Sequence, residues 1–247
     1  RWDYNIEPNP FWRSVDPTGA IQFAYMKGLY RVLDTLMARY PDWMVETCAS
    51  GGRRFDLGTI RRAHTCWISD HTTYPEVCRH MQARANRFLP GHLLNSSVAV
   101  SPGRGLSELD DTAILSRMLG KLAFDGDIAS LSPEVALRAR HWSEVFKSIR
   151  HLLVQDFHQL TPAPTTVDGW DVMSFNAYDG SEAALFAFSG REAGEMSIPL
   201  RGLQAGTVYR TECQNDGTVA ERTGAQLMKE GLRISLGKNS AQLWWLR

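Results

Sequence analysis

Short apolar runs alternate with segments of helical periodicity over the first 152 residues, and this alternation constrains the fold more than any other feature. Strands that alternate with helices form βαβ units, in which the strands are parallel. The pattern predicts strands near residues 1–5, 43–46, 64–69, 92–98 and 122–128, and helices at 18–39, 73–88 and 132–153. Five units of this size match the roughly 31 residues per unit of an eight-unit barrel. Residues 1–153 are therefore predicted to be an α/β domain, the C-terminal portion of a (β/α)8 TIM-type barrel.

The remaining residues, 154–247, have a different character. Turn signals separate short runs of partly alternating hydrophobicity, at Asp179-Gly180, Ser189-Gly190 and Asp216-Gly217. Regularly spaced turns between short alternating runs are typical of a small antiparallel β-sandwich. Alternation in the last run also predicts that either Trp244 or Trp245 is a core residue. The sequence thus predicts a second domain, an antiparallel β-sandwich, over residues 154–247.

Charge and cysteine content limit the partners that the chain can have. Lys+Arg and Asp+Glu number 27 each, so no basic surface for nucleic acid or an anionic membrane is expected. No apolar run approaches the ~20 residues of a membrane span. The four cysteines lack the paired C-x₂₋₄-C spacing of structural zinc sites, despite nearby histidines. Scattered reduced thiols indicate a reducing compartment, so a cytoplasmic location is expected.

Two aspartates follow predicted parallel strands, where barrels of this type place their chemistry. Asp3 and Asp70 are 67 residues apart, about two βα units. Alternate strands point into the same layer, which brings the two carboxyl groups to roughly 5–7 Å. The lower distance is typical of a retaining glycosidase, and the upper distance leaves room for the water of an inverting one. Helix capping or ion pairing is the alternative role for both aspartates, and Asp70 does precede a predicted helix.

Three short segments contain these aspartates or lie between them: RWDYN at 1–5, ETCASGGRRFD at 46–56 and CWISDHT at 66–72. In order and spacing they resemble three linked motifs of glycoside hydrolase family 36, the α-galactosidase family. The matching positions are Trp2, Asp3, Asn5, Cys48, Gly51, Gly52, Arg54, Phe55, Asp56, Trp67, Ser69 and Asp70. The resemblance covers the whole barrel region, and a C-terminal sandwich is also a feature of the family.

The resemblance implies a retaining glycoside hydrolase that releases terminal α-linked galactose from oligosaccharides and needs no metal or cofactor. It implies that Asp3 is the nucleophile and Asp70 the general acid/base. The substrate-binding residues that follow from it are Arg1, Asn5, Cys48, Gly51, Gly52 and Trp67. Relatives in the family also include N-acetylgalactosaminidases and sugar-transferring synthases, so the preferred glycoside stays open.

The sequence departs from the family pattern at three positions. Arg1 replaces a lysine, Arg53 stands where a further glycine is common, and His71 stands where an acid is common. Arginine keeps the charge of lysine but has a different shape and donor geometry. The segment Ser50-Gly51-Gly52 lacks the G-x-x-x-x-G-K-[ST] context of a phosphate-binding loop, so that alternative is disfavoured.

The first motif stands at the start of the chain, so we expect the chain to begin partway through its barrel. An open parallel sheet would then need its edge covered by a second copy of the chain or by a complementing N-terminal part. Weak activity or none is the corresponding expectation for the chain alone. A non-catalytic fragment that only binds sugar is the alternative function.

Overall fold

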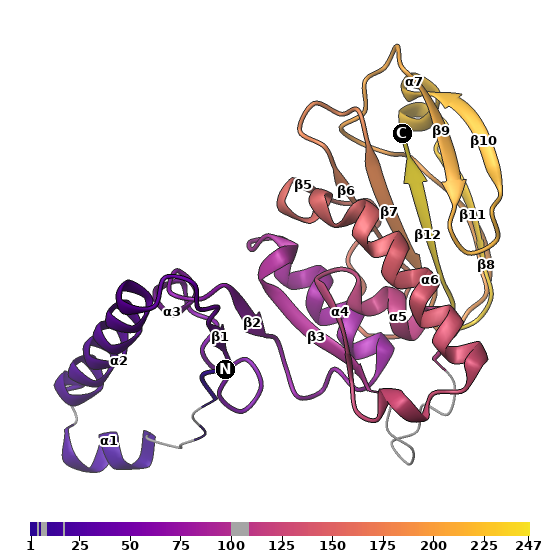
Figure 1. Ribbon diagram of the computed structural model, residues 1–247. Helices are drawn as coiled ribbons and strands as arrows, with labels where there is room; N and C mark the ends of the chain where they lie inside the picture. Colours follow the sequence, from indigo (N-terminus) through magenta and orange to yellow (C-terminus); the bar gives the residue numbers. More distant parts are fainter. Residues whose placement is uncertain (4, 6–8, 17, 100–108) are drawn as a thin grey trace. The chain divides into compact units, whose positions relative to one another are not determined.

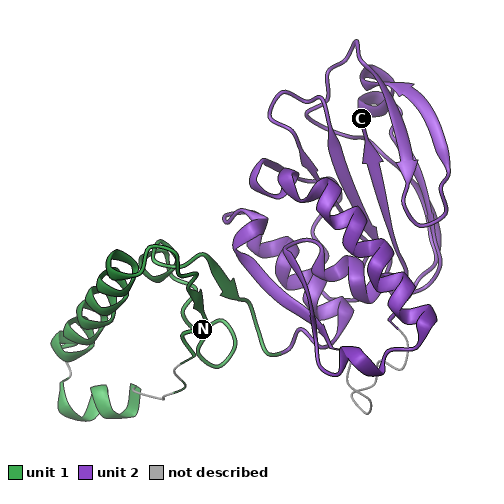
Figure 2. Cartoon of the chain, viewed as in Figure 1, with its two compact units in different colours: residues 1–70 green, residues 71–247 purple. Residues whose placement is uncertain are grey.

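The structure is a computed structural model that describes residues 1–3, 5, 9–16, 18–99 and 109–247. The chain divides into two compact units, Arg1–Asp70 and His71–Arg247 (Figure 2). Residue 4 of the predicted first strand lies outside the described residues. Within the described chain, no helix combines the length and the apolar composition that crossing a bilayer requires.

The first unit contains two parallel strands and three helices (Figure 1). Its elements are α1 (Asn9–Val15), α2 (Ala20–Arg39), β1 (Glu46–Thr47), α3 (Leu57–Ile60) and β2 (Thr65–Trp67). β1 pairs in parallel with β2, and Trp2 forms a further parallel bridge to Thr47. Three parallel segments therefore follow one another in the order that a βαβ succession requires.

The predicted helix at 18–39 is confirmed as α2, whose Leu29 and Leu33 are buried. The strand predicted at 43–46 is wrong in its position, since β1 starts only at Glu46. The Trp43 amide instead closes a turn on the Tyr40 carbonyl at 3.1 Å, and the two rings stack with centroids 4.2 Å apart. Only the end of this stretch reaches the sheet, where the Val45 carbonyl accepts from the His64 amide at 2.8 Å.

The second unit begins with alternating helices and parallel strands. These elements are α4 (Pro75–Ala85), β3 (Leu94–Ala99), α5 (Asp111–Arg117), β4 (Lys121–Asp125) and α6 (Pro133–Ile149), with short 3-10 turns at Gly91–Leu93, Ile128–Ser130 and Arg150–Val154. β3 and β4 are parallel, with Asn95 opposite Lys121. The Asp110 carboxylate caps α5 by accepting from the Ala113 amide at 2.6 Å. The predicted α/β character of this region is therefore confirmed.

The C-terminal part is antiparallel, as the sequence predicts. Its elements are β5 (Asp156–Gln159), β6 (Asp171–Asn176), β7 (Ala183–Phe188), β8 (Gly194–Ile198), β9 (Val208–Cys213), β10 (Val219–Thr223), α7 (Gly224–Lys229), β11 (Leu232–Leu236) and β12 (Ala241–Leu246). Six strands form one sheet in the order β10-β9-β12-β7-β6-β5, and β11 pairs with β8 in a second. Strands consecutive in the sequence pair at β5–β6, β6–β7 and β9–β10, whereas β12 lies between β7 and β9.

Two hydrophobic cores cover the two faces of the six-stranded sheet. Helices α5 and α6 lie along one face (Figure 1). Trp142 of α6 belongs there to the same core as Phe186 and Leu243. The two-stranded sheet covers the other face, where Ile234 packs with Leu185. Because side chains alternate along a strand, each face of the sheet contributes to a separate core.

The tryptophan pair on β12 shows this alternation. Trp244 is 7% exposed and belongs to the core under the two-stranded sheet, while the partly buried Trp245 packs on the helical side. The prediction that one of them is a core residue is confirmed. The core between the six-stranded sheet and helices α5 and α6 contains residues from both sides of position 153. The predicted boundary between domains 1–153 and 154–247 stays a prediction.

Candidate active site

The Arg1 guanidinium lies at the centre of the predicted site residues in the first unit. Its Nη2 donates to Cys48 Sγ at 3.1 Å, and its Nε lies 3.5 Å from Asp3 Oδ2. Its Nη1 lies 3.3 Å from Glu46 Oε1. Its Cζ stands 4.8 Å from the centre of the Trp67 ring, close enough for a cation–π interaction. One side chain thus contacts residues from all three sequence motifs.

These contacts also set the charge state of Arg1. Burial lowers its pKa, but the hydrogen bond to Cys48 and the charges of Glu46 and Asp3 outweigh burial and raise that pKa. The guanidinium is therefore a permanent positive charge beside the Asp3 carboxylate.

The loop after β1 has an unusual backbone conformation. Four consecutive residues adopt positive φ: Ala49 at 102°, Ser50 at 45°, Gly51 at 67° and Gly52 at 84°. The Ser50 amide donates to Asn5 Oδ1 at 2.6 Å, and its hydroxyl lies 3.3 Å from the same oxygen. A non-glycine residue at positive φ is held only where its surroundings fix it, and Asn5 provides that support for Ser50.

Both glycines of this loop are required by close packing as well as by φ. A Cβ on Gly51 would lie 2.4 Å from the Asp70 amide nitrogen and 2.9 Å from Asp70 Cγ. A Cβ on Gly52 would lie 2.3 Å from the Ile68 carbonyl oxygen. The loop backbone therefore packs directly against the segment that ends in Asp70, and only glycine permits this approach.

Asp70 is exposed, and its carboxylate is oriented by a neighbouring tryptophan. Trp67 Nε1 donates to Asp70 Oδ1 at 3.0 Å. The N-cap residue of α4 is Tyr74, so Asp70 does not occupy that cap position. Of the two alternative roles, ion pairing applies to Asp3, through Arg1, and the role of Asp70 as an outer cap stays a prediction.

The structure connects the two aspartates through Arg1 and Trp67. Arg1 pairs with Asp3 and stacks over the same indole whose N–H holds Asp70. Asp3 is thus held by an ion pair, and Asp70 by a hydrogen bond. An oriented pair of carboxylates is what acid/base and nucleophilic chemistry on a glycoside needs. The predicted carboxyl separation stays a prediction.

Two acidic residues near the site have roles that the motifs did not reveal. Glu46 is a partner of Arg1 that sequence reasoning missed, although it lies two positions before Cys48, on the same face of the strand. Asp56, in the second motif, accepts from the Thr59 amide at 2.9 Å and from the Tyr30 hydroxyl at 3.0 Å. Burial alone would raise the pKa of Asp56, but these hydrogen bonds lower it. Asp56 therefore supports α3 as its cap.

No group of three or more His, Cys, Asp or Glu side chains suited to a metal ion occurs in the described part of the chain. All four cysteines are buried and carry free thiols. Burial raises the pKa of Cys66, and this favours its neutral thiol. The polar groups of the site are thus carboxylates, a guanidinium, an indole N–H and backbone amides.

Comparison with known proteins gives consistent matches over both parts of the chain. Residues 1–156 match the family model described as Melibiase, and residues 170–246 match the glycosyl hydrolase family 36 C-terminal domain. The probable alpha-galactosidase G of Aspergillus terreus is 28% identical over 244 residues, which cover 95% of this chain and 32% of that protein. Alpha-galactosidase C of Emericella nidulans is 30% identical over 228 residues, or 89% of this chain and 29% of that protein.

A solved structure has the same fold. A variant of the GH36 alpha-galactosidase AgaA from Geobacillus stearothermophilus, in complex with 1-deoxygalactonojirimycin, superposes with a TM-score of 0.76 at 25% identity. The match covers 90% of this chain and 31% of that one. The chain spans about a third of the length of the relatives it matches.

Proposed function

The chain belongs to the melibiase family, glycoside hydrolase family 36, and from that premise we propose that it carries the catalytic carboxylates of a retaining α-galactosidase. Asp3 is the nucleophile and Asp70 the general acid/base. The observation that supports this assignment most directly is the chain of contacts in which Arg1 pairs with Asp3 and stacks on Trp67, which holds Asp70. The two relatives described above are named alpha-galactosidases, and this supports galactose as the sugar.

The proposed reaction has two displacements. In the first, the Asp70 carboxyl gives its proton to the glycosidic oxygen while an Asp3 oxygen attacks the anomeric carbon, so the bond to the leaving group breaks and a β-galactosyl ester forms. In the second, the Asp70 carboxylate removes a proton from water, whose oxygen attacks the same carbon and releases Asp3. The product is α-galactose, with the configuration of the substrate.

Arg1 supports this chemistry in a way that a lysine could not reproduce. Its planar guanidinium reaches Asp3, Glu46 and Cys48 at once, through three different nitrogens. An ammonium group is a compact point charge and cannot span three such partners in a fixed fork. We therefore assign Arg1 the role of fixing the Asp3 carboxylate, and Cys48 and the Gly51 amide the role of sugar contacts.

Azide rescue tests both assignments through product stereochemistry. The starting measurement is turnover of an aryl α-galactoside by the unsubstituted chain, and each variant is then compared with it. In Asp3→Gly, azide should replace the nucleophile and give the β-galactosyl azide. In Asp70→Gly, azide should attack the galactosyl ester on Asp3 and give the α-galactosyl azide. Proton NMR of the products distinguishes the two anomers.

Asp42→Gly is the matched control, because Asp42 is an exposed aspartate of the same unit outside the three motifs. It should keep full turnover and form no azide adduct. Rescue products of the opposite configurations would reverse the two roles. Galactose binding without turnover would favour the alternative, a non-catalytic sugar-binding chain. Light scattering on the same samples would measure whether the chain assembles with a second copy.

A further inference from the structure

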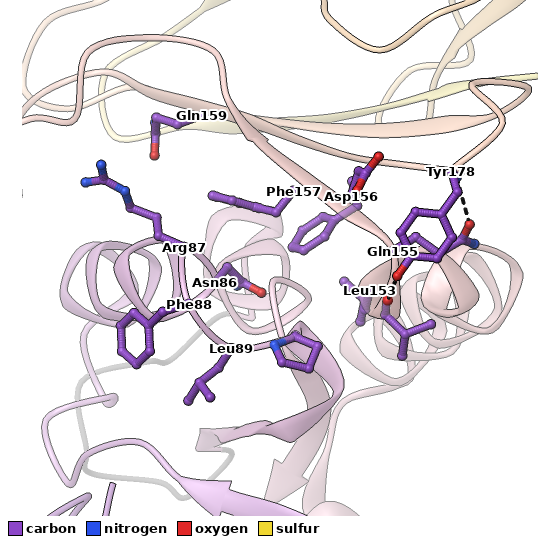
Figure 3. A pocket seen from close by; sticks show the side chains of 14 residues that line it. Asn86, Arg87, Phe88, Leu89, Leu153, Gln155, Asp156, Phe157, Gln159 and Tyr178 are labelled. Carbon is purple, nitrogen blue, oxygen red and sulfur yellow. Dashed lines mark hydrogen bonds between the residues drawn. The ribbon is translucent and has the colours of Figure 1, made fainter. Parts of the chain in front are cut away.

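A depression in the second unit contains none of the motif residues. It lies between the end of α4 with its following turn and the start of β5, and its volume is about 580 Å³ (Figure 3). Small-molecule sites in proteins commonly have volumes of roughly 300–1,000 Å³. The depression is therefore large enough for a ligand of one or two sugar rings.

Two exposed aromatic rings border the depression. Tyr178 is 70% exposed and Phe88 is 64% exposed, and Figure 3 shows them on opposite sides. The Tyr178 hydroxyl donates to the Val154 carbonyl at 2.9 Å, and its amide donates to Gln155 Oε1 at 3.0 Å. These two bonds fix an aromatic face that remains open to solvent. A fixed, exposed ring loses little conformational entropy when a ligand stacks on it.

The charged groups of the lining indicate a neutral ligand. The exposed Arg87 lies on the side of Phe88, and the exposed Asp156 lies on the side of Tyr178 (Figure 3). The two opposite charges offset each other, so the lining gives neither an anion nor a cation a net electrostatic attraction. A neutral ligand rich in hydroxyl groups can instead accept from the guanidinium and donate to the carboxylate.

Two residues that line the depression each have a side-chain oxygen that accepts no hydrogen bond from the described residues. The two oxygens are Asn86 Oδ1 and Gln159 Oε1, and Asn86 is only 6% exposed. Figure 3 shows the Asn86 amide directed into the group of lining side chains. Both oxygens are closed to solvent in this conformation, although their residues belong to the lining of the depression. A buried acceptor without a donor is unfavourable, and a hydroxyl group that reaches it removes this cost.

We propose that this depression is a second carbohydrate-binding site, which takes a neutral sugar of one or two rings. The apolar C–H face of the sugar stacks on Tyr178, and its hydroxyls bond to the side chains of Asp156 and Arg87. Carbohydrates combine an apolar face with many hydroxyl groups and no charge, and this combination matches the lining. The site goes beyond the proposed function, and only the choice of a galactose-containing probe rests on that function.

The experiment follows Tyr178 itself during a titration with raffinose, a neutral trisaccharide whose terminal galactose, alone or with the next ring, would occupy the depression. The chain is labelled with ¹³C at the rings of its seven tyrosines and carries Asp3→Asn, so that the proposed hydrolysis cannot consume the probe. The Tyr178 signal is assigned as the one missing from Tyr178→Phe. It should shift with raffinose and saturate. Asp156→Ala and Arg87→Ala should each weaken the fitted affinity about tenfold, which corresponds to about 1.4 kcal/mol.

Leu137→Ala is the control, since it removes a 66% exposed apolar side chain of α6 that does not line the depression. It should leave the titration unchanged. A Tyr178 signal that stays fixed up to tens of millimolar raffinose would overturn the proposal. A signal that moves with protein concentration instead would identify an interface between copies and would overturn it too. Because this readout needs no turnover, a failed α-galactosidase assay would leave its result intact.

Discussion

Gly51→Ala should separate the geometric role of the loop from its contribution to stability. Gly51 has φ of +67°, and a side chain in this region costs roughly 1–2 kcal/mol. The new Cβ would lie 2.4 Å from the Asp70 amide nitrogen, whereas ordinary contact begins at 3.4 Å. The Asp70 backbone must then move by about 1 Å, the difference between these distances. A backbone nitrogen cannot rotate aside, so the shift also moves the carboxylate.

Two effects of different size follow. Overpacking adds roughly 1–3 kcal/mol to the conformational cost, so the free energy of unfolding should fall by about 2–5 kcal/mol. Misplacement of a catalytic group by about 1 Å lowers turnover on the order of 100-fold. Urea unfolding measures the first effect, and kcat/KM for an aryl α-galactoside measures the second.

Gly19→Ala provides the matched control within the same unit. Gly19 has φ of +83°, yet no atom lies within 4 Å of its added Cβ. The free energy of unfolding of Gly19→Ala should fall only by the conformational cost of positive φ, about 1–2 kcal/mol, and kcat/KM should stay unchanged. Equal kcat/KM for the two variants would refute the argument that Gly51 sets the position of Asp70.

Three further outcomes follow from the second unit. Arg84→Ala should destabilise it by about 3–5 kcal/mol, because Asp171 is fully buried and pairs with Arg84 at 3.2 Å; a loss below 1 kcal/mol in urea unfolding would contradict this. Burial lowers the pKa of His80 and of His158 below the unfolded value of 6.5, so the unfolded chain binds more protons in mild acid. Burial lowers the pKa of His92 in the same direction. The free energy of unfolding should therefore be highest above about pH 6.5 and fall as the pH drops through the folded values, and a weaker pH dependence in His80→Gln/His158→Gln would check the cause. Burial raises the pKa of Cys213 to about 11, so a disulfide reagent at pH 8 should label this thiol only after unfolding; rapid labelling of the folded chain would contradict the buried environment.

Local sequence signals determined much of the fold. The apolar spacing of residues 18–39 was enough to locate α2, and the turn signals after residue 154 were enough to predict antiparallel strands. Alternation also placed one tryptophan of β12 in a core. These features depend on periodicity within one segment, which a sequence displays directly. The three motifs likewise identified the family and the candidate aspartates.

Other features depended on contacts between segments far apart in the chain. No local pattern indicates that Arg1 reaches Glu46 as well as Cys48, 47 residues away, or that Gly51 touches the Asp70 backbone. The depression beside Tyr178 arises in the same way, from the turn after α4 and the start of β5. The sequence therefore determined which residue types and periods are present. Only the tertiary structure decided which residues meet. The distances between segments are set by many weak packing contacts, which local propensity does not determine.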